Sequence, residues 1–176
     1  PSSAHRHWAP TEGPVLAGPS PPPERHLLAE PEQAESAWAG PVPAASSADG
    51  AKLVATTGPR IYTSTNSAAT WVANNVPVAE WWQCVASSAD GCQLVAVAWK
   101  GGQIYHSTNS GVSWTLTSAP KNYWASVASS ADGVRLIAAG SDAGDKRIHV
   151  STNAGEIWTV TGHSNYYWTA VASSAD

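Results

Sequence analysis

The sequence contains no methionine and no phenylalanine, and it has only two cysteines among its 176 residues. Charged residues are also scarce, at 12% of the chain, and the formal net charge is −4. This balance argues against a nucleic-acid-binding protein, because phosphate recognition needs clustered lysine and arginine. No apolar run approaches the length of a membrane-spanning helix, so we expect no membrane span.

Two further signals are missing. No Asn-x-Ser/Thr glycosylation site occurs, and no basic segment followed by an apolar one marks a signal peptide. The compartment stays open, with an extracellular or organelle-lumen location slightly favoured. The chain starts at Pro1 and stops at Asp176 inside a repeated phrase, which leads us to expect a piece of a longer protein.

The two cysteines are expected to be unbonded. If residues 88–91 form a tight turn, Ser88 faces Cys92, and Cys84 lies four residues before Ser88. At about 3.3 Å per residue, that separation is far beyond disulfide reach. A disulfide or a shared metal ion remains the alternative to two small apolar side chains in a sheet.

The first 43 residues differ in composition from the rest. Ten of the 13 prolines lie there, among them the run Pro21-Pro22-Pro23. Proline supplies no backbone donor, and such a segment buries little surface. We expect a mostly disordered linker or tail at 1–43 and a folded region at 44–176.

An eight-residue motif ending in tryptophan organises the folded region. It reads STNSGVSW at 107–114, and it recurs as STNSAATW at 64–71 and as STNAGEIW at 151–158. The three tryptophans, Trp71, Trp114 and Trp158, lie 43 and 44 residues apart. A period of this length with short strands is typical of a β-propeller, in which each repeat forms one blade.

A second phrase, VASSADG, runs in step with the motif. It begins at Val85 and Val127, restarts at Val171, and has a partial copy that ends at Gly50. The two phrases together divide the folded region into blades at about 44–80, 81–121 and 122–164, with the start of a fourth at 165–176.

Each complete repeat is expected to contain four antiparallel strands, A to D. In the second repeat both faces of strand B are apolar, with Leu94 and Ala96 on one and Val95 and Val97 on the other, as in a strand packed between two blades. The first repeat has Pro41 and Pro43 where strand A should run, and the fourth has only its strand A. The expected strands are 82–87, 93–98, 103–108 and 112–117 in the second repeat, 124–129, 135–139, 147–151 and 156–161 in the third, and 52–56, 60–64 and 70–73 in the first.

The motif resembles the Asp-box, or bacterial neuraminidase repeat, S-x-D-x-G-x-x-W. The whole unit is similar to repeats of photosystem II assembly and stability factor-like propellers. In that family the box is the turn between strands C and D. Here asparagine stands where aspartate is expected, and Ala68 replaces the glycine of the first copy. The positions that match the box are Asn66, Trp71, Asn109, Gly111, Trp114, Asn153, Gly155 and Trp158.

These motif residues are interpreted as structural. An asparagine side chain can accept a hydrogen bond from the backbone two residues on, and glycine supplies a positive φ. The tryptophan is expected to anchor strand D against the next blade. Neutral asparagine weakens the case for a calcium site, because hard cations favour carboxylates. We predict no metal, no cofactor and no catalytic residue.

Sialidases share the box, so a sialidase-like glycoside hydrolase is the enzyme hypothesis. Such enzymes are marked by an arginine cluster for the substrate carboxylate, a Tyr–Glu nucleophile pair and an acid aspartate. The blade region has only three arginines, and Arg135 is expected at the opposite blade end from Arg60 and Arg147. The repeating aspartates all fall in the turn between strands A and B. His106 and His149 occupy non-equivalent positions of strand C and so form no shared metal face.

The end of each blade that carries the D–A and B–C loops is the candidate binding surface. Aromatic side chains with a few cations suit stacking on a sugar ring or a peptide. Trp82, Trp124 and Trp168 are expected to pack between blades, whereas the residue before each lies on the opposite strand face. The candidate residues are Trp81, Tyr123, Tyr167, Arg60, Lys100 and Arg147.

We therefore expect a non-catalytic binding or scaffold module, with a protein or a glycan as ligand and no nucleic acid. A glycoside hydrolase fragment is the alternative, followed by a structural array or gene fragment without independent function. A three-blade chain would leave open sheet edges, and open edges recruit other chains, so the isolated chain should self-associate.

Overall fold

The computed structural model describes residues 43–77, 80–141, 144–162 and 166–175. All of them belong to one compact unit, Ser36–Asp176. Every regular element among them is a β-strand, and they contain no helix able to cross a membrane. The expected disordered tail at 1–43 lies outside the described residues except for Pro43, so that expectation and the boundary at residue 44 stay predictions.

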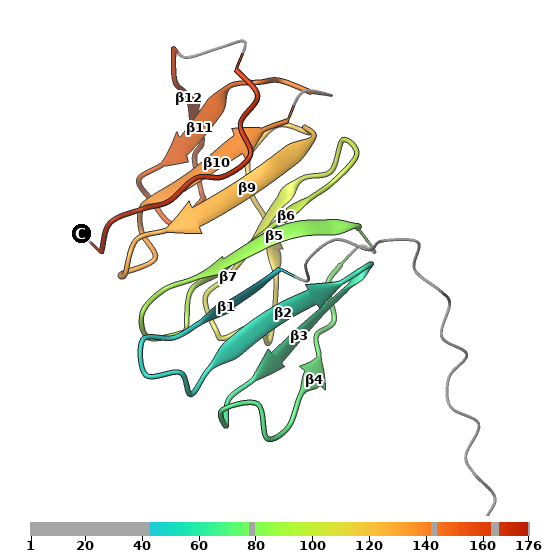
Figure 1. Cartoon of the computed structure of the whole chain (residues 1–176), viewed down its shortest axis with the longest axis vertical. Helices are drawn as coiled ribbons and strands as arrows, with labels where there is room; N and C mark the ends of the chain where they lie inside the picture. The colour runs from blue at the N-terminus through green and yellow to red at the C-terminus, as the bar shows by residue number, and fades with distance from the viewer. Residues whose placement is uncertain (1–42, 78–79, 142–143, 163–165, 176) are drawn as a thin grey trace, which may run out of the picture. The chain divides into compact units, whose positions relative to one another are not determined.

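Twelve strands form three four-stranded antiparallel sheets (Figure 1), as the repeats predicted. Each sheet is one repeat, and we call the three sheets blades 1, 2 and 3. Blade 1 contains β1 (Ala44–Ser46), β2 (Leu53–Thr57), β3 (Arg60–Ser64) and β4 (Val72–Ala73). Blade 2 contains β5 (Trp82–Ser87), β6 (Leu94–Ala98), β7 (Ile104–Ser107) and β8 (Thr115–Leu116). Blade 3 contains β9 (Trp124–Ser129), β10 (Leu136–Gly140), β11 (Ile148–Ser151) and β12 (Thr159–Val160).

The observed strands match the predicted ones closely at strands A to C, and β3, β5 and β9 coincide with them. Strand D is shorter than expected, with two residues in every blade. Strand A of the first repeat does form, as the three-residue β1, although the prolines limit its length. Residues 166–175 form no strand, which corrects the expected fourth strand A, because no second strand of that repeat lies beside them.

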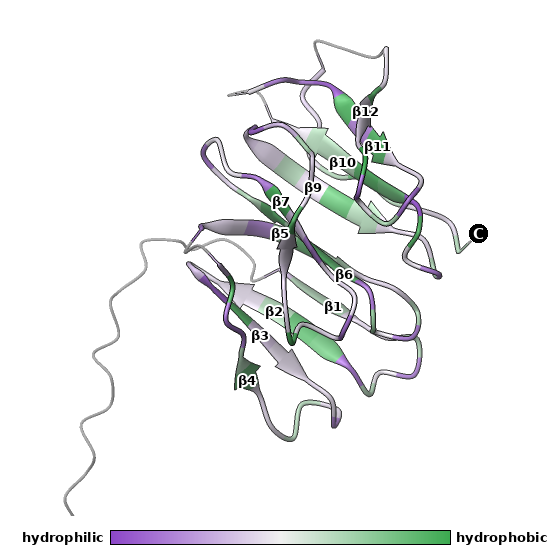
Figure 2. Ribbon diagram, turned by 180° about the vertical axis from the view of Figure 1, so that it is seen from behind, coloured by the Kyte–Doolittle hydropathy of each residue, from purple (hydrophilic) through white to green (hydrophobic). Residues whose placement is uncertain are grey.

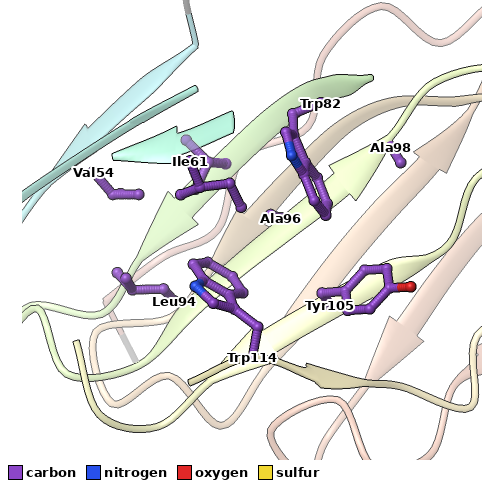
Figure 3. Close-up of a cluster of buried hydrophobic side chains, with 9 residues drawn as sticks. Val54, Ile61, Trp82, Leu94, Ala96, Ala98, Tyr105 and Trp114 are labelled. Atoms are coloured by element: carbon purple, nitrogen blue, oxygen red, sulfur yellow. The ribbon is translucent and has the colours of Figure 1, made fainter. Parts of the chain in front are cut away.

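The hydrophobic core consists of two clusters of side chains, one between blades 1 and 2 (Figure 3) and one between blades 2 and 3. The ribbon coloured by hydropathy shows hydrophobic residues along the strands of all three blades (Figure 2). Strand β6 is buried on both faces, as its sequence predicted. Its residues Leu94, Ala96 and Ala98 pack against blade 1, and Val95 and Val97 pack against blade 3. A strand that contacts a sheet on each side has no room for alternating polar residues.

The motif tryptophan packs against the preceding blade, which corrects the expectation that it anchors the next one. Trp114 of blade 2 is 5% exposed and lies with Val54 and Ile61 of blade 1. Trp158 of blade 3 packs on the cluster between blades 2 and 3. Trp71 of blade 1 is 43% exposed, because no described residues lie on that face of blade 1 to cover it.

A serine hydroxyl is the centre of each C–D turn. The Ser107 Oγ accepts the N–H of Gly111 at 2.9 Å and donates to the Asn109 Oδ1 at 3.0 Å. The same oxygen of Asn109 accepts the N–H of Ser113 at 2.9 Å, so the asparagine caps a residue four positions on rather than two. The Trp114 Nε1 then donates to the Gly111 carbonyl at 3.1 Å. The turns around Asn66 and Asn153 repeat the serine and asparagine bonds.

The A–B turns are closed in a similar way. In blade 2 the Ser88 Oγ donates to the Asp90 Oδ1 at 2.6 Å and accepts the N–H of Gln93 at 2.9 Å. The Asp90 Oδ1 also accepts the N–H of Cys92 at 2.9 Å. These bonds lower the pKa of Asp90, since they favour the ionised carboxylate. Ser47 with Asp49 and Ser130 with Asp132 make equivalent contacts.

Backbone hydrogen bonds join the A–B turns of successive repeats. The N–H of Ala48 donates to the Ala89 carbonyl at 2.7 Å, Ala89 to Ala131 at 2.8 Å, and Ala131 to Ala175 at 3.0 Å. These four alanines hold the same place in the SSAD phrase. We call the three bonds the turn ladder; it extends past blade 3 to the fourth copy of the phrase.

Both cysteines are free, as predicted, although the hairpin register differs from the expected one. Ser87 pairs with Leu94, and the Ser88 N–H bonds the Gln93 carbonyl at 2.8 Å, so Cys92 lies within the turn and does not face Ser88. Cys84 pairs with Val97. The sulfur of Cys92 accepts a hydrogen bond from the Lys52 Nζ at 3.1 Å, whereas Cys84 packs against the cluster between blades 2 and 3.

Ala68 is predicted to weaken its turn. It has φ 69°, while Gly111 and Gly155 have φ 86° and 89° at the same position. A side chain in this region costs about 1 kcal/mol. Ala68→Gly should therefore raise the melting temperature by about 2–4 °C in a chain of this size, measured by circular dichroism.

The reciprocal change, Gly111→Ala, should lower the melting temperature. It would adopt a positive φ, and its Cβ would lie 2.6 Å from the Asn74 Nδ2 and 2.8 Å from the Thr63 Cγ2. If Ala68→Gly lowered the melting temperature and Gly111→Ala left it unchanged, the role assigned to the positive φ in this turn would be wrong.

Candidate functional site

The candidate surface lies at the blade end that carries the B–C loops and the D–A segments. Each D–A segment bonds the B–C loop of the preceding blade. The N–H of Trp82 donates to the Gly58 carbonyl at 3.2 Å, and the N–H of Asn122 donates to the Gly102 carbonyl at 3.0 Å. The loops at this end are therefore held by the same blade-to-blade contacts as the core.

Asn122 is a polar centre of this end that the sequence analysis did not single out. It is 3% exposed. Its Oδ1 accepts the N–H groups of Tyr123 and Asp145 at 2.8 and 2.7 Å, and its Nδ2 donates to the Asp145 carbonyl at 3.0 Å. Gly140 and Gly144 permit this approach, because a Cβ on either would lie within 2.6 Å of the amide.

Three aromatic side chains form the first part of the surface. Trp81 is 52% exposed, and its carbonyl accepts the N–H of Trp99 at 2.7 Å. Trp99 meets the half-buried Tyr123 edge to face, with ring centroids 6.3 Å apart. The structure thus connects two predicted residues through Trp99, which the repeat does not mark because it follows strand B only in the second copy.

Tyr167 and Lys146 form the second part, and two further cations, Lys100 and Arg60, lie at the same blade end. Tyr167 is 73% exposed, and the Lys146 Nζ lies 4.4 Å from its ring centroid. Lys100 is exposed in the B–C loop of blade 2 with φ 56°, and Arg60 is exposed at the start of β3. Lys146 was not among the candidate cations, yet it is the one that lies beside an aromatic ring of this surface.

Arg147 is engaged rather than free. Its Nε and Nη2 donate to the carboxylate of Asp145 at 2.6–2.9 Å. This pairing lowers the pKa of Asp145 and raises the pKa of Arg147. The Asp145 carboxylate also lies 3.6 Å from the His149 Nε2. The Asp145 carboxylate is therefore paired with groups of its own blade, which makes it a poor calcium ligand.

His149 is a buried titratable group at the base of this end. It occupies the position of Tyr105 in blade 2, and its ring meets Trp124 edge to face at 5.0 Å, as Tyr105 meets Trp82 at 5.6 Å. It is fully buried, and neither ring nitrogen has a hydrogen-bond partner in the described part of the chain. Burial lowers the pKa of His149, an effect that Asp145 partly opposes.

Trp82 and Trp124 pack between blades as expected, whereas Trp168 lies on blade 3 with no further sheet over it in the described residues. Trp82 and Trp124 are 6% and 0% exposed, and Trp168 is half-buried with its Nε1 bonded to the Lys146 carbonyl at 2.8 Å. His106 pairs with Thr115 and is not equivalent to His149. Arg135 lies beside the A–B turn, at the opposite blade end from Arg60 and Arg147.

The three aspartates that recur in the described A–B turns serve those turns. Burial is negligible at Asp49, Asp90 and Asp132, and hydrogen bonds from the neighbouring serine lower the pKa of each. The described residues contain no group of three or more His, Cys, Asp or Glu side chains able to hold a metal ion. A shallow hollow beside β4, lined by Asn74 and Ser110 among others, lies at the C–D turn end and away from the aromatic surface.

No protein-family profile and no curated protein sequence matches the chain. Solved structures do resemble it. The chain is 27% identical to the GH74 enzyme of Niastella koreensis, with a TM-score of 0.58, over 71% of this chain and 18% of that one. It is 12% identical to YCF48 bound to a D1 peptide, with a TM-score of 0.56, over 68% and 39% of the two chains.

A third similar structure is the hydrazine synthase of Kuenenia stuttgartiensis, at 15% identity and a TM-score of 0.60, over 78% of this chain and 40% of that one. The chain spans less than half the length of each of these proteins. The GH74 and YCF48 structures are β-propellers, so the chain is built of propeller-type repeats.

His149 predicts an acid-sensitive fold. The pKa of His149 is about 6.5 in the unfolded chain and is lower in the folded chain. Below about pH 6.5, His149 therefore takes up a proton more readily in the unfolded chain than in the folded one. Stability is therefore fully present above about pH 6.5 and declines as the pH falls toward the folded pKa. His149→Phe keeps the ring against Trp124 and removes the titration.

The melting temperature should fall more steeply in the parent chain than in His149→Phe between about pH 7 and pH 5. His106→Phe is the matched control and should keep the steep decline. Parallel curves for the parent chain and His149→Phe would contradict the role of His149.

Proposed function

We propose that the chain is a non-catalytic binding or scaffold module that recognises a protein or glycan with the loop end of its blades. The observation that carries the proposal is an aromatic surface of exposed Trp81 and Tyr167 and half-buried Trp99 and Tyr123, with Lys146 beside Tyr167. Flat rings with adjacent cations suit a sugar ring or a peptide side chain. Loops positioned by a rigid sheet are a common place for recognition.

The blades are proposed to be of the Asp-box type. The serine and asparagine of each copy hold the C–D turn by the same bonds, and asparagine performs the acceptor role through its Oδ1. In the second and third copies the tryptophan Nε1 adds a bond to the carbonyl of the motif glycine. A structural role for these residues leaves ligand recognition to the other blade end.

The similar structures support both a peptide and a glycan ligand. One is YCF48 bound to a D1 peptide, and others are GH74 enzymes, one of them a xyloglucanase of Xanthomonas campestris. We favour binding over hydrolysis because Asp145 is paired with Arg147, while Asp49, Asp90 and Asp132 are bonded within turns. Most glycoside hydrolases use one carboxylic acid and one carboxylate across the scissile bond, whereas sialidases have a tyrosine nucleophile and still need an acid.

The test is a titration of the purified chain with xyloglucan oligosaccharides, sialyllactose and an unstructured peptide library, followed by tryptophan fluorescence and calorimetry. We expect saturable binding by one class. Trp81→Ala and Tyr167→Ala should each weaken it about tenfold, since stacking on one ring contributes roughly 1–2 kcal/mol. Ile157→Ala, an exposed apolar residue at the opposite blade end, is the control and should bind normally.

The alternatives give different results. Release of reducing ends or of sialic acid from the sugars, lost in Asp145→Asn, would favour the glycoside hydrolase. An absence of saturable binding to any of the three ligand classes would favour the structural array.

A further inference from the structure

The outer face of blade 1 repeats a face that is buried in blade 2. Leu53, Ala55, Tyr62 and Trp71 hold the positions of Leu94, Ala96, Tyr105 and Trp114. The four residues of blade 2 are 5%, 0%, 3% and 5% exposed, because blade 1 covers them. In blade 1, Trp71 is 43% exposed, and the other three are half-buried. We call this set the blade 1 face.

The other end of the array presents the complementary part. Residues 168–175 repeat strand A and its turn, and they lie along blade 3 beside β9 (Figure 1). The Val171 N–H bonds the Ser126 Oγ at 3.3 Å, and the Ala175 carbonyl accepts the last bond of the turn ladder. This segment holds the place of a fourth strand A without a strand B beside it.

Blade 1 lacks the tryptophan that begins strand A in blades 2 and 3, and the C-terminal segment carries such a tryptophan. In blade 2 the first residue of strand A, Trp82, meets the Tyr105 ring of strand C (Figure 3). In blade 3 Trp124 meets His149 in the same way. In the first repeat Pro41 stands at that tryptophan position. Tyr62 has no aromatic partner in the described part of the chain, while Trp168 holds the tryptophan position in the fourth copy of the phrase, which forms no strand.

Strand β1 is also the weakest of the three A strands. It has three residues, against six in β5 and β9. Pro43 precedes it and has no N–H to donate. The phrase at 168–173 has a backbone donor at every position and begins with tryptophan. It therefore fits the edge of β2 better than the native segment does.

We propose that two copies of this chain form a closed head-to-tail dimer in which residues 168–175 of each copy displace β1 of the other copy and pair with its β2, the strand that β1 pairs with inside one chain. Trp168 then stacks on Tyr62 of the second copy, and the blade 1 face covers the outer face of blade 3. The turn ladder continues across the junction, since Ala175 takes the place of Ala48. Two such junctions join six blades, which lies within the closure range of about four to eight.

The first test is light scattering after size-exclusion chromatography of the whole chain. The parent chain should run as a monodisperse species with twice the mass of one chain, and Trp168→Ala should run as a monomer. Trp81→Ala is the matched control, because Trp81 is an exposed tryptophan at the same blade end but outside the junction, and it should stay dimeric. A monomeric parent chain overturns the proposal.

The second test fixes the register and does not depend on whether Trp168→Ala folds. In a Cys84→Ala, Cys92→Ser background, Leu53→Cys is combined with Ser173→Cys, because Ser46 faces Leu53 in β1 and Ser173 repeats Ser46. Oxidation should give a covalent dimer, and neither single cysteine substitution should do so. A monomer cross-linked within one chain, or a ladder of higher multimers, would overturn the closed dimer. The cross-linking result does not depend on whether Trp81→Ala weakens ligand binding. The dimer and the binding function can therefore be tested independently of each other.

Discussion

The contact between successive blades is the interaction on which the structure depends. Each blade is a four-stranded sheet with two apolar faces. Each face can be buried only by the blade that lies next to it on that side. Blade 2 shows the complete case: Trp114 and Leu94 are covered by blade 1, while Val95 and Val97 are covered by blade 3. Truncation of a buried tryptophan such as Trp114 would cost roughly 3–5 kcal/mol, a large part of the stability of a domain this size.

Hydrogen bonds at both blade ends set the alignment of that apolar contact. The turn ladder joins Ala48, Ala89, Ala131 and Ala175 at one end. At the other end, Trp82 and Asn122 bond the B–C loop of the preceding blade. Apolar packing by itself is non-directional, so these backbone bonds determine how one blade is placed on the next.

The two blade ends consequently have different roles. At the turn end, the side chains of the repeated serines, aspartates and asparagines make hydrogen bonds within their own turns. The loop end is supported by Asn122 and by the pair of Asp145 and Arg147, and its aromatic rings remain exposed. The same division explains why the repeated, motif-like residues are structural, whereas the residues proposed to bind ligand vary between copies.

The sequence alone determined the repeat, its four antiparallel strands and the positive φ at Gly111 and Gly155, because strand alternation and turn chemistry are local properties. It also indicated the two apolar faces of β6. The tertiary structure decided which blade covers each tryptophan, since the motif is the same whether Trp114 faces backward or forward. It also decided the shift of one residue that places Cys92 in the turn, the junction at Asn122, and the burial of His149 against Trp124. The junction at Asn122 and the burial of His149 join groups that lie far apart in the sequence, and a local pattern carries no information about such contacts. The shift at Cys92 is local, but the turn residues permit either register, and the bonds of Ser88 with Gln93 select one.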